Sequence, residues 1–252
     1  MSFLTLIAAA YLALCGWLYA TQRAQIYFPT AERAHPGAQV LRLESQEERF
    51  NVWVLPRATS RALIYFGGNA EDVAGNIDVF SEAFPGHALY IVNYRGYGGS
   101  SGRPSEAALF ADALVLDEYV RARHSEISVM GRSLGSGVAV YLASERPVAK
   151  LVLVTAFDSL VNVARQHFRW LPVGLLLRDR YESTARARTV KAPVLMVIAG
   201  EDEIIPRARS EALVAAFAPG QVTIHVVPMA THNTLDLAPE YLDAVGAFLE
   251  PR

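Results

Sequence analysis

The chain has 252 residues, of which 52% are hydrophobic and 19% are charged, and its formal net charge is −2. This length and composition predict a globular protein, with one large α/β core or two small domains, and exclude a disordered chain. Nucleic acid is not an expected partner, because the lysine and arginine residues form no cluster. The single cysteine, Cys15, excludes an intrachain disulfide and a thiolate metal site.

The first predicted element is an uncharged run of 18 residues, 3–20. Its length is at the lower limit for a membrane-spanning helix, and Trp17, Tyr19 and Tyr27 near its C-terminal end are typical of a membrane interface. We therefore expect a single-pass, uncleaved membrane anchor over residues 1–24.

Two other interpretations of this run stay open, a cleaved signal peptide and a buried or interfacial helix. The signal peptide is disfavoured because no basic residue precedes the run and no clear small-residue cleavage site follows it. Arg23 and Arg33 follow the run. They mildly favour a cytoplasmic location for the rest of the chain without deciding the side of the membrane.

Residues 25–252 alternate between short apolar runs and helical patterns. The apolar runs predict an edge pair of strands at 40–43 and 50–55, and further strands at 61–66, 88–93, 127–130, 151–154, 193–199 and 222–227. Helices are expected at 71–84, 106–123, 207–217 and 239–249, and after the turn at residues 131–135. Apolar strands between helices indicate a mostly parallel sheet covered on both faces, with ligands beyond the carboxyl ends of the strands.

The turn at residues 131–135 reads Gly131-Arg132-Ser133-Leu134-Gly135, which is G-x-S-x-G. In a nucleophile elbow this serine sits on a strained turn between a strand and a helix. The glycines are required because a side chain at either place would collide where strand and helix cross. The Leu134 N–H begins the predicted helix, where it can stabilise an oxyanion. A small-residue turn without function has the same pattern, so other parts of the chain must support the chemistry.

Polar residues follow other predicted strands at the point where each strand ends. A glycine turn, Gly67-Gly68-Asn69, follows one strand; Asp202 follows another; His232 follows the last. The carboxyl ends of parallel strands lie on one edge of a sheet, so these residues and Ser133 are expected there together. The chain order Ser, Asp, His is the order found when an elbow belongs to an α/β-hydrolase.

Six motifs between residue 25 and the C-terminus extend this pattern: QIYFP, YFGGNAED, NYRGYGGSSG, GRSLGSG, EDEIIP and THNTLD. With them the chain resembles the α/β-hydrolase fold, and within it the membrane-anchored BEM46-like and ABHD-like serine hydrolases. The resemblance implies one α/β-hydrolase domain over residues 25–252, with Ser133 as nucleophile, His232 as base and Asp202 as the acid that orients the imidazole. It implies no cofactor, and the chain has no metal-binding spacing of the H-E-x-x-H kind.

Two positions depart from the family pattern. Gly67 stands where the family usually has histidine, yet the oxyanion donor is still expected to be the Asn69 N–H, since it is a main-chain group. The acid turn is one residue shorter than usual, and the following Glu203–Pro206 segment selects Asp202. Glu201 remains the alternative acid, and an ordinary N-cap is the alternative role for Asp202.

Residues 157–185 lie between two core strands and include Phe168, Trp170 and Leu171, so we expect a small helical cap there. These side chains either cover the site or contact an acyl chain. The expected function is cleavage of an ester or thioester, on an acyl or lipid-like small molecule, through an acyl-enzyme. An amidase or peptidase with the same triad, and a catalytically silent membrane scaffold, are the alternatives.

Overall fold

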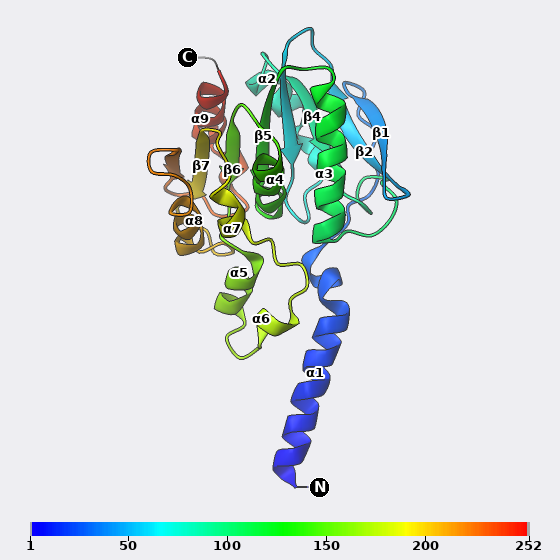
Figure 1. Cartoon of the computed structure of the whole chain (residues 1–252), viewed down its shortest axis with the longest axis vertical. Coiled ribbons are helices and arrows are strands. Elements are labelled where there is room, and N and C mark those ends of the chain that lie inside the picture. The colour runs from blue at the N-terminus through cyan, green and yellow to red at the C-terminus, as the bar shows by residue number, and fades with distance from the viewer. Residues whose placement is uncertain (1, 251–252) are drawn as a thin grey trace.

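The computed structural model describes residues 2–250, which fold around one sheet of eight strands (Figure 1). The strands are β1 (Gln39–Ser45), β2 (Glu48–Leu55), β3 (Arg61–Phe66), β4 (Ala88–Val92), β5 (Glu126–Arg132), β6 (Leu151–Val154), β7 (Val194–Ala199) and β8 (Val222–Val227). Their order in the sheet is β1-β2-β4-β3-β5-β6-β7-β8. The first two strands pair antiparallel at one edge, β2 runs antiparallel to β4, and all later pairs are parallel.

Helices occur on both faces of the sheet and at the N-terminus. They are α1 (Phe3–Ile26), α2 (Ile77–Ala83), α3 (Glu106–Arg121), α4 (Leu134–Glu145), α5 (Leu160–His167), α6 (Val173–Leu176), α7 (Ser183–Ala187), α8 (Arg207–Val214) and α9 (Pro239–Leu249). Residues 2–250 also contain two 3₁₀ turns, Val73–Asn76 and Leu235–Leu237. The expected mostly parallel α/β architecture is confirmed, and each strand begins and ends within two residues of its predicted bounds.

The core has two parts because alternate residues of a strand point to opposite faces of the sheet. In β3, Ala62, Ile64 and Phe66 join the cluster that packs against α3 and α4. Leu63 and Tyr65 join the cluster that packs against α2 and α9. Both faces of the central strands are therefore buried, which explains why their sequences are apolar throughout rather than alternating.

The helix expected over residues 71–84 is wrong in its first half. Residues 73–76 form a 3₁₀ turn, and α2 begins only at Ile77. The Asp72 carboxylate accepts the Ala74 N–H at 3.3 Å and caps the 3₁₀ turn. Glu71 is held outside any helix because its carboxylate accepts the Gly68 N–H at 2.6 Å. These side-chain bonds to the backbone compete with α-helical hydrogen bonds.

The helix α1 extends away from the sheet, and the 157–185 segment lies beside it (Figure 1). This helix is long and apolar enough to cross a membrane, and few of its residues are buried. It runs six residues beyond the uncharged run 3–20, to Ile26. Its last turns are bonded to the 157–185 segment: Arg23 makes two hydrogen bonds with Asp179, at 2.9 and 3.0 Å, and the Gln22 amide donates to the Leu176 carbonyl oxygen at 3.0 Å.

The crossing of β5 and α4 leaves no space for side chains at two glycines. A Cβ atom at Gly131 would overlap the carbonyl oxygen of Gly135, and one at Gly135 would overlap the carbonyl oxygen of Phe66. The expectation that both glycines are required for steric reasons is confirmed. The obstructing atoms are backbone atoms of the helix and of the neighbouring strand, so they cannot move aside as a flexible side chain could.

The same substitution at two helical glycines should therefore change stability in opposite directions. Gly135→Ala should lower the free energy of unfolding by about 1–3 kcal/mol, because the added methyl group overpacks the crossing. Gly246→Ala in α9 should raise the free energy of unfolding by about 0.5–1 kcal/mol, because alanine favours the helix more than glycine does. The new Cβ has room there, since the nearest atom is the Ala83 carbonyl oxygen at 3.5 Å. Urea unfolding of both variants tests this. Equal effects at the two sites would contradict the steric account.

Candidate active site

Ser133 lies at the turn between β5 and α4, with backbone angles of φ 49° and ψ −118°. A positive φ is strained for a residue that has a Cβ, and such strain persists only where the surrounding structure enforces it. Here the Ser133 N–H donates to the Val154 carbonyl oxygen of β6 at 2.9 Å, which fixes the turn to the sheet. The turn is followed at once by Leu134, the first residue of α4.

Loops from the ends of β7 and β8 bring two further predicted residues to Ser133. His232 Nε2 lies 3.1 Å from Ser133 Oγ, and His232 Nδ1 lies 2.8 Å from Asp202 Oδ2. The side chains of His232 and Asp202 are 8% and 3% exposed, so water screens their interaction weakly. In such a chain of hydrogen bonds, the imidazole can take the proton of the hydroxyl and so activate it as a nucleophile, while the carboxylate orients the imidazole.

Asp202 uses its second carboxylate oxygen to hold its own turn. Oδ1 accepts the N–H groups of Ile204 and Ile205 at 2.9 and 2.7 Å. The alternative that Asp202 caps the following helix is wrong, because α8 begins after Pro206 without a side-chain cap. The alternative acid, Glu201, is exposed. Its N–H donates to the Ala230 carbonyl oxygen at 2.9 Å, which joins the acid loop to the loop before His232.

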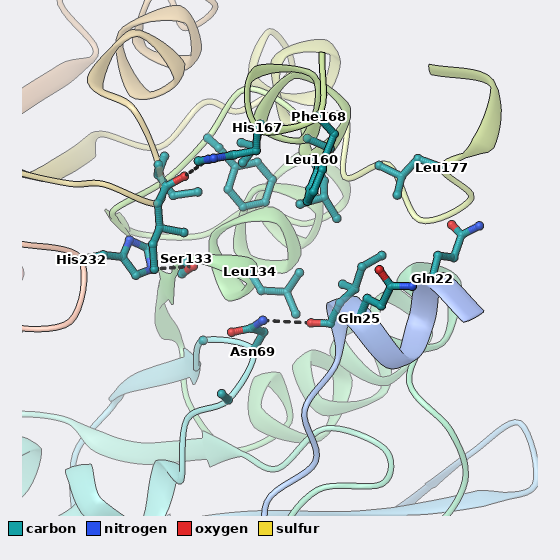
Figure 2. Close-up of a pocket in the computed structure, with 18 of the residues that line it drawn as sticks. Gln22, Gln25, Asn69, Ser133, Leu134, Leu160, His167, Phe168, Leu177 and His232 are labelled. Atoms are coloured by element: carbon teal, nitrogen blue, oxygen red, sulfur yellow. Dashed lines mark hydrogen bonds between the residues drawn. The ribbon is translucent and has the colours of Figure 1, made fainter. Parts of the chain in front are cut away.

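Asn69 lies in the loop after β3, and hydrogen bonds fix it to the end of α1, to Phe28 just after it and to the loop after β4. Its side-chain amide donates to the Ile26 carbonyl oxygen at 3.0 Å (Figure 2), and its own carbonyl accepts the Phe28 N–H at 3.3 Å and the Tyr97 hydroxyl at 2.5 Å. Within residues 2–250, the N–H groups of Asn69 and Leu134 donate to no protein acceptor. Both groups are therefore available to a ligand.

The absence of a histidine at position 67 has a structural explanation. A Cβ atom at Gly67 would lie 2.5 Å from Val73 Cγ1 and 3.3 Å from the Glu71 carboxyl carbon. The space for a side chain is thus already filled by residues that come later in the same loop. The Gly67 carbonyl oxygen accepts the Tyr94 hydroxyl at 2.7 Å, so the backbone stays fixed without an imidazole.

A network beside Ser133, formed around the partly buried Arg132, was not predicted from the sequence. Arg132 Nη2 donates to the His232 carbonyl oxygen at 3.1 Å, and Arg132 Nη1 lies 3.7 Å from both the Glu71 and the Asp236 carboxylates. Burial alone lowers the pKa of the Arg132 guanidinium, but Tyr65, Glu71 and Asp236 raise it above its usual value. This arginine joins the turn that carries Ser133 to the loops that follow β3 and β8. Arg132 lies in the GRSLGSG motif and Glu71 in the YFGGNAED motif, but the sequence does not show that their side chains meet.

A cavity of about 650 Å³ adjoins Ser133 and His232. Figure 2 shows these two residues on one side of it and Gln22, Gln25 and Leu177 on the other. Beside the loops that carry the predicted site residues, its walls come from α1 and from the 157–185 segment. These two parts contribute residues that include Leu18, Gln22, Gln25, Ile26, Leu160, Val163, Phe168, Leu176 and Leu177. Sequence reasoning did not place α1 at this site. The cavity is mostly apolar, which suits an apolar part of a ligand.

Residues 61–184 match the family model described as the alpha/beta hydrolase fold. An uncharacterized protein of Mycobacterium tuberculosis, Rv2307c, is 38% identical over 251 residues, which cover 92% of this chain and 89% of that protein. Protein bem46 of Schizosaccharomyces pombe is 30% identical over 202 residues, covering 74% of this chain and 66% of that protein.

Solved structures agree on the fold. The esterase Pf2001 of Pyrococcus furiosus superimposes with a TM-score of 0.72 at 15% identity, covering 88% of this chain and 97% of that one. At this identity the likeness concerns the fold alone. Taken with the sequence matches, it leaves one conclusion: the chain belongs to the α/β-hydrolase family, in its BEM46-like branch.

Proposed function

We propose that the protein is a serine hydrolase that cleaves an ester or thioester bond through Ser133, His232 and Asp202. The observation that carries the proposal is the unbroken sequence of hydrogen bonds from the Asp202 carboxylate through both imidazole nitrogens to the Ser133 hydroxyl, at 2.8 and 3.1 Å. The family supplies hydrolase chemistry, and the positive φ of Ser133 holds the hydroxyl at the end of β5, where it faces the cavity.

The reaction divides into two steps. His232 takes the hydroxyl proton as Ser133 Oγ bonds to the substrate carbonyl carbon, and it then protonates the leaving group. The N–H groups of Asn69 and Leu134 stabilise the negative oxygen of the tetrahedral intermediate, each contributing about 3 kcal/mol. Asp202 stabilises the imidazolium. Water, deprotonated by His232, then releases the acid from the acyl-enzyme and restores the serine hydroxyl.

The apolar cavity points to an acyl group as the part of the substrate that is retained on Ser133. Its volume of about 650 Å³ is within the range of small-molecule sites. In this proposal the 157–185 segment acts as a small cap on a domain formed by residues 25–252. Residues 1–24 act as a single-pass anchor, which would keep the site close to acyl lipids.

The serine can be tested by two substitutions that separate chemistry from stability. Ser133→Ala should abolish hydrolysis of a p-nitrophenyl acyl ester with a melting temperature close to that of the wild type. Ser133→Gly should also be inactive, but should raise the free energy of unfolding by about 1 kcal/mol, because glycine tolerates the positive φ. Ester hydrolysis and urea unfolding are the measurements. Undiminished turnover in either variant would remove Ser133 from the mechanism.

Two neighbouring carboxylates provide a matched test of the acid. Asp202→Asn should lower kcat by about ten-thousandfold, because the amide no longer stabilises the imidazolium or selects its tautomer. Glu201→Gln, one residue earlier and exposed, should leave kcat unchanged. Steady-state kinetics with the same ester decides between them. A larger loss in the Glu201 variant would reverse the assignment.

Membrane fractionation can test the proposed anchor. The uncharged run 3–20 should hold the full-length protein in the membrane pellet during an alkaline carbonate wash, since such a wash releases proteins held only by polar contacts. Immunoblotting of pellet and supernatant measures this. Release of the protein into the supernatant would contradict an anchor that spans the bilayer.

A further inference from the structure

The tip of the 157–185 segment, residues 168–178, lies against the middle of α1 rather than only at its end. The Tyr11 hydroxyl donates to the Trp170 carbonyl oxygen at 2.9 Å. Nearer the domain, the Gln22 side chain bonds to the Leu176 carbonyl and to the Arg178 N–H, at 3.0 and 2.7 Å. The tip therefore runs along α1 and is bonded to it at two levels.

These contacts fix where the tip lies relative to the apolar run. Tyr11 precedes Ile26, the last residue of α1, by 15 positions, which at the rise of an α-helix is about 22 Å. Tyr11 also lies inside the uncharged run 3–20. Any bilayer that surrounds this run must therefore also meet the tip of the 157–185 segment.

The exposed side chains of the tip suit such a contact. Trp170 and Leu175 are 60% and 86% exposed, and neither lines the cavity. Residues 160–178 contain Arg165, Arg169 and Arg178, all exposed, but no acidic residue. Apolar side chains beside arginines are typical of a surface that enters the lipid interface, where the guanidinium groups reach anionic headgroups.

Several backbone groups of the tip are paired within the 157–185 segment or with α1, which lowers the cost of placing them beside lipid. The Phe168 N–H donates to the Ala164 carbonyl at 2.8 Å, and the Leu171 N–H donates to the Phe168 carbonyl at 3.1 Å. The Trp170 carbonyl is satisfied by Tyr11 at 2.9 Å. Arg180 Nη1 donates to the Gly174 carbonyl at 2.9 Å.

The cavity beside Ser133 extends to the same region. Its lining includes Leu18 of α1, together with Leu176 and Leu177 of the tip. Leu18 precedes Ile26 by eight positions, about 12 Å along the helix, and belongs to the uncharged run. One end of the cavity is therefore at the catalytic hydroxyl, and the other is among residues that would contact the bilayer.

We propose that residues 168–178 are seated in the lipid bilayer beside α1, and that the cavity takes the acyl chain of a membrane-resident ester or thioester directly from the bilayer. The part of this inference that concerns the substrate rests on the proposed hydrolase function. The lipid contact of the tip does not depend on that function. In this arrangement α1 forms a wall of the acyl-binding cavity as well as an anchor.

The three tryptophans of the chain allow a direct test of the lipid contact. Full-length proteins that keep only Trp17, only Trp53 or only Trp170, with phenylalanine at the other two positions, are reconstituted into vesicles of phosphatidylcholine and phosphatidylglycerol with brominated acyl chains. Bromine quenches tryptophan fluorescence only at close range. Trp17 lies on α1, and Trp53 is buried in the core at 5% exposure, so they are the positive and negative controls.

We expect quenching of Trp170 comparable with that of Trp17 and well above that of Trp53. Quenching of Trp17 but not of Trp170 would overturn the seating of the tip. If neither Trp17 nor Trp170 is quenched, both the seating of the tip and the membrane anchor would be overturned.

A second experiment tests delivery of the substrate from the bilayer. Trp170→Ser/Leu175→Ser is compared with Val79→Ser/Ile224→Ser, which removes two apolar side chains that are 46% and 48% exposed on α2 and β8. With p-nitrophenyl butyrate in solution, both variants should match the wild type. With p-nitrophenyl palmitate in vesicles, the tip variant should lose about tenfold in rate, and the control variant should lose none.

Equal rates of the two variants on vesicles would contradict delivery from the bilayer. Absence of butyrate hydrolysis in the wild type would instead remove the hydrolase function, and the fluorescence result would stand by itself. If the tip variant does not fold, the fluorescence measurement still decides whether the tip meets lipid.

Discussion

The close crossing of β5 and α4 is the constraint on which the rest of the site depends. Backbone oxygens of Gly135 and Phe66 occupy the positions that side chains at residues 131 and 135 would need. The chain turns between strand and helix within one residue, and Ser133 takes the strain of that turn as a φ of 49°. Packing of the sheet and helix on either side supplies the free energy that maintains this strain. The hydroxyl and the first free N–H groups of α4 consequently meet at a single place on the sheet edge.

Much of this arrangement could be predicted from the sequence, because it depends on local patterns and on one topological rule. The apolar runs locate the strands, and parallel strands put their carboxyl ends on one edge, so Ser133, Asp202 and His232 were expected together. The prediction of a helix over 71–84 is wrong in its first half, because the carboxylates of Glu71 and Asp72 accept hydrogen bonds from nearby backbone N–H groups. The network around Arg132 and the position of the 157–185 segment depend on contacts between distant residues, which no local pattern encodes.

The N-terminal helix is connected to the site through buried polar groups as well as through apolar packing. The Asp179 side chain is only 3% exposed. Its carboxylate charge is balanced by Arg23, whose Nε lies 2.9 Å from Oδ2, and it accepts a hydrogen bond from the Tyr27 hydroxyl at 3.0 Å. Burial, and next the charge of Asp179, raise the pKa of Tyr27, so its hydroxyl stays protonated and donates to the carboxylate. Ile26 accepts from the Asn69 side chain. The loop that holds a proposed oxyanion donor is therefore attached to the end of α1, and a shift of this helix would displace both that loop and the cavity wall.

The central claim is that the hydroxyl of residue 133 is activated by the imidazole of residue 232. A fluorophosphonate probe reacts covalently with such a hydroxyl, and mass spectrometry of the intact protein and of its peptides locates the adduct. We expect one adduct per chain, on Ser133. The adduct should be lost in a His232→Ala protein that keeps the wild-type circular dichroism spectrum. A wild-type protein that stays unlabelled, or one labelled at a different residue, would contradict it.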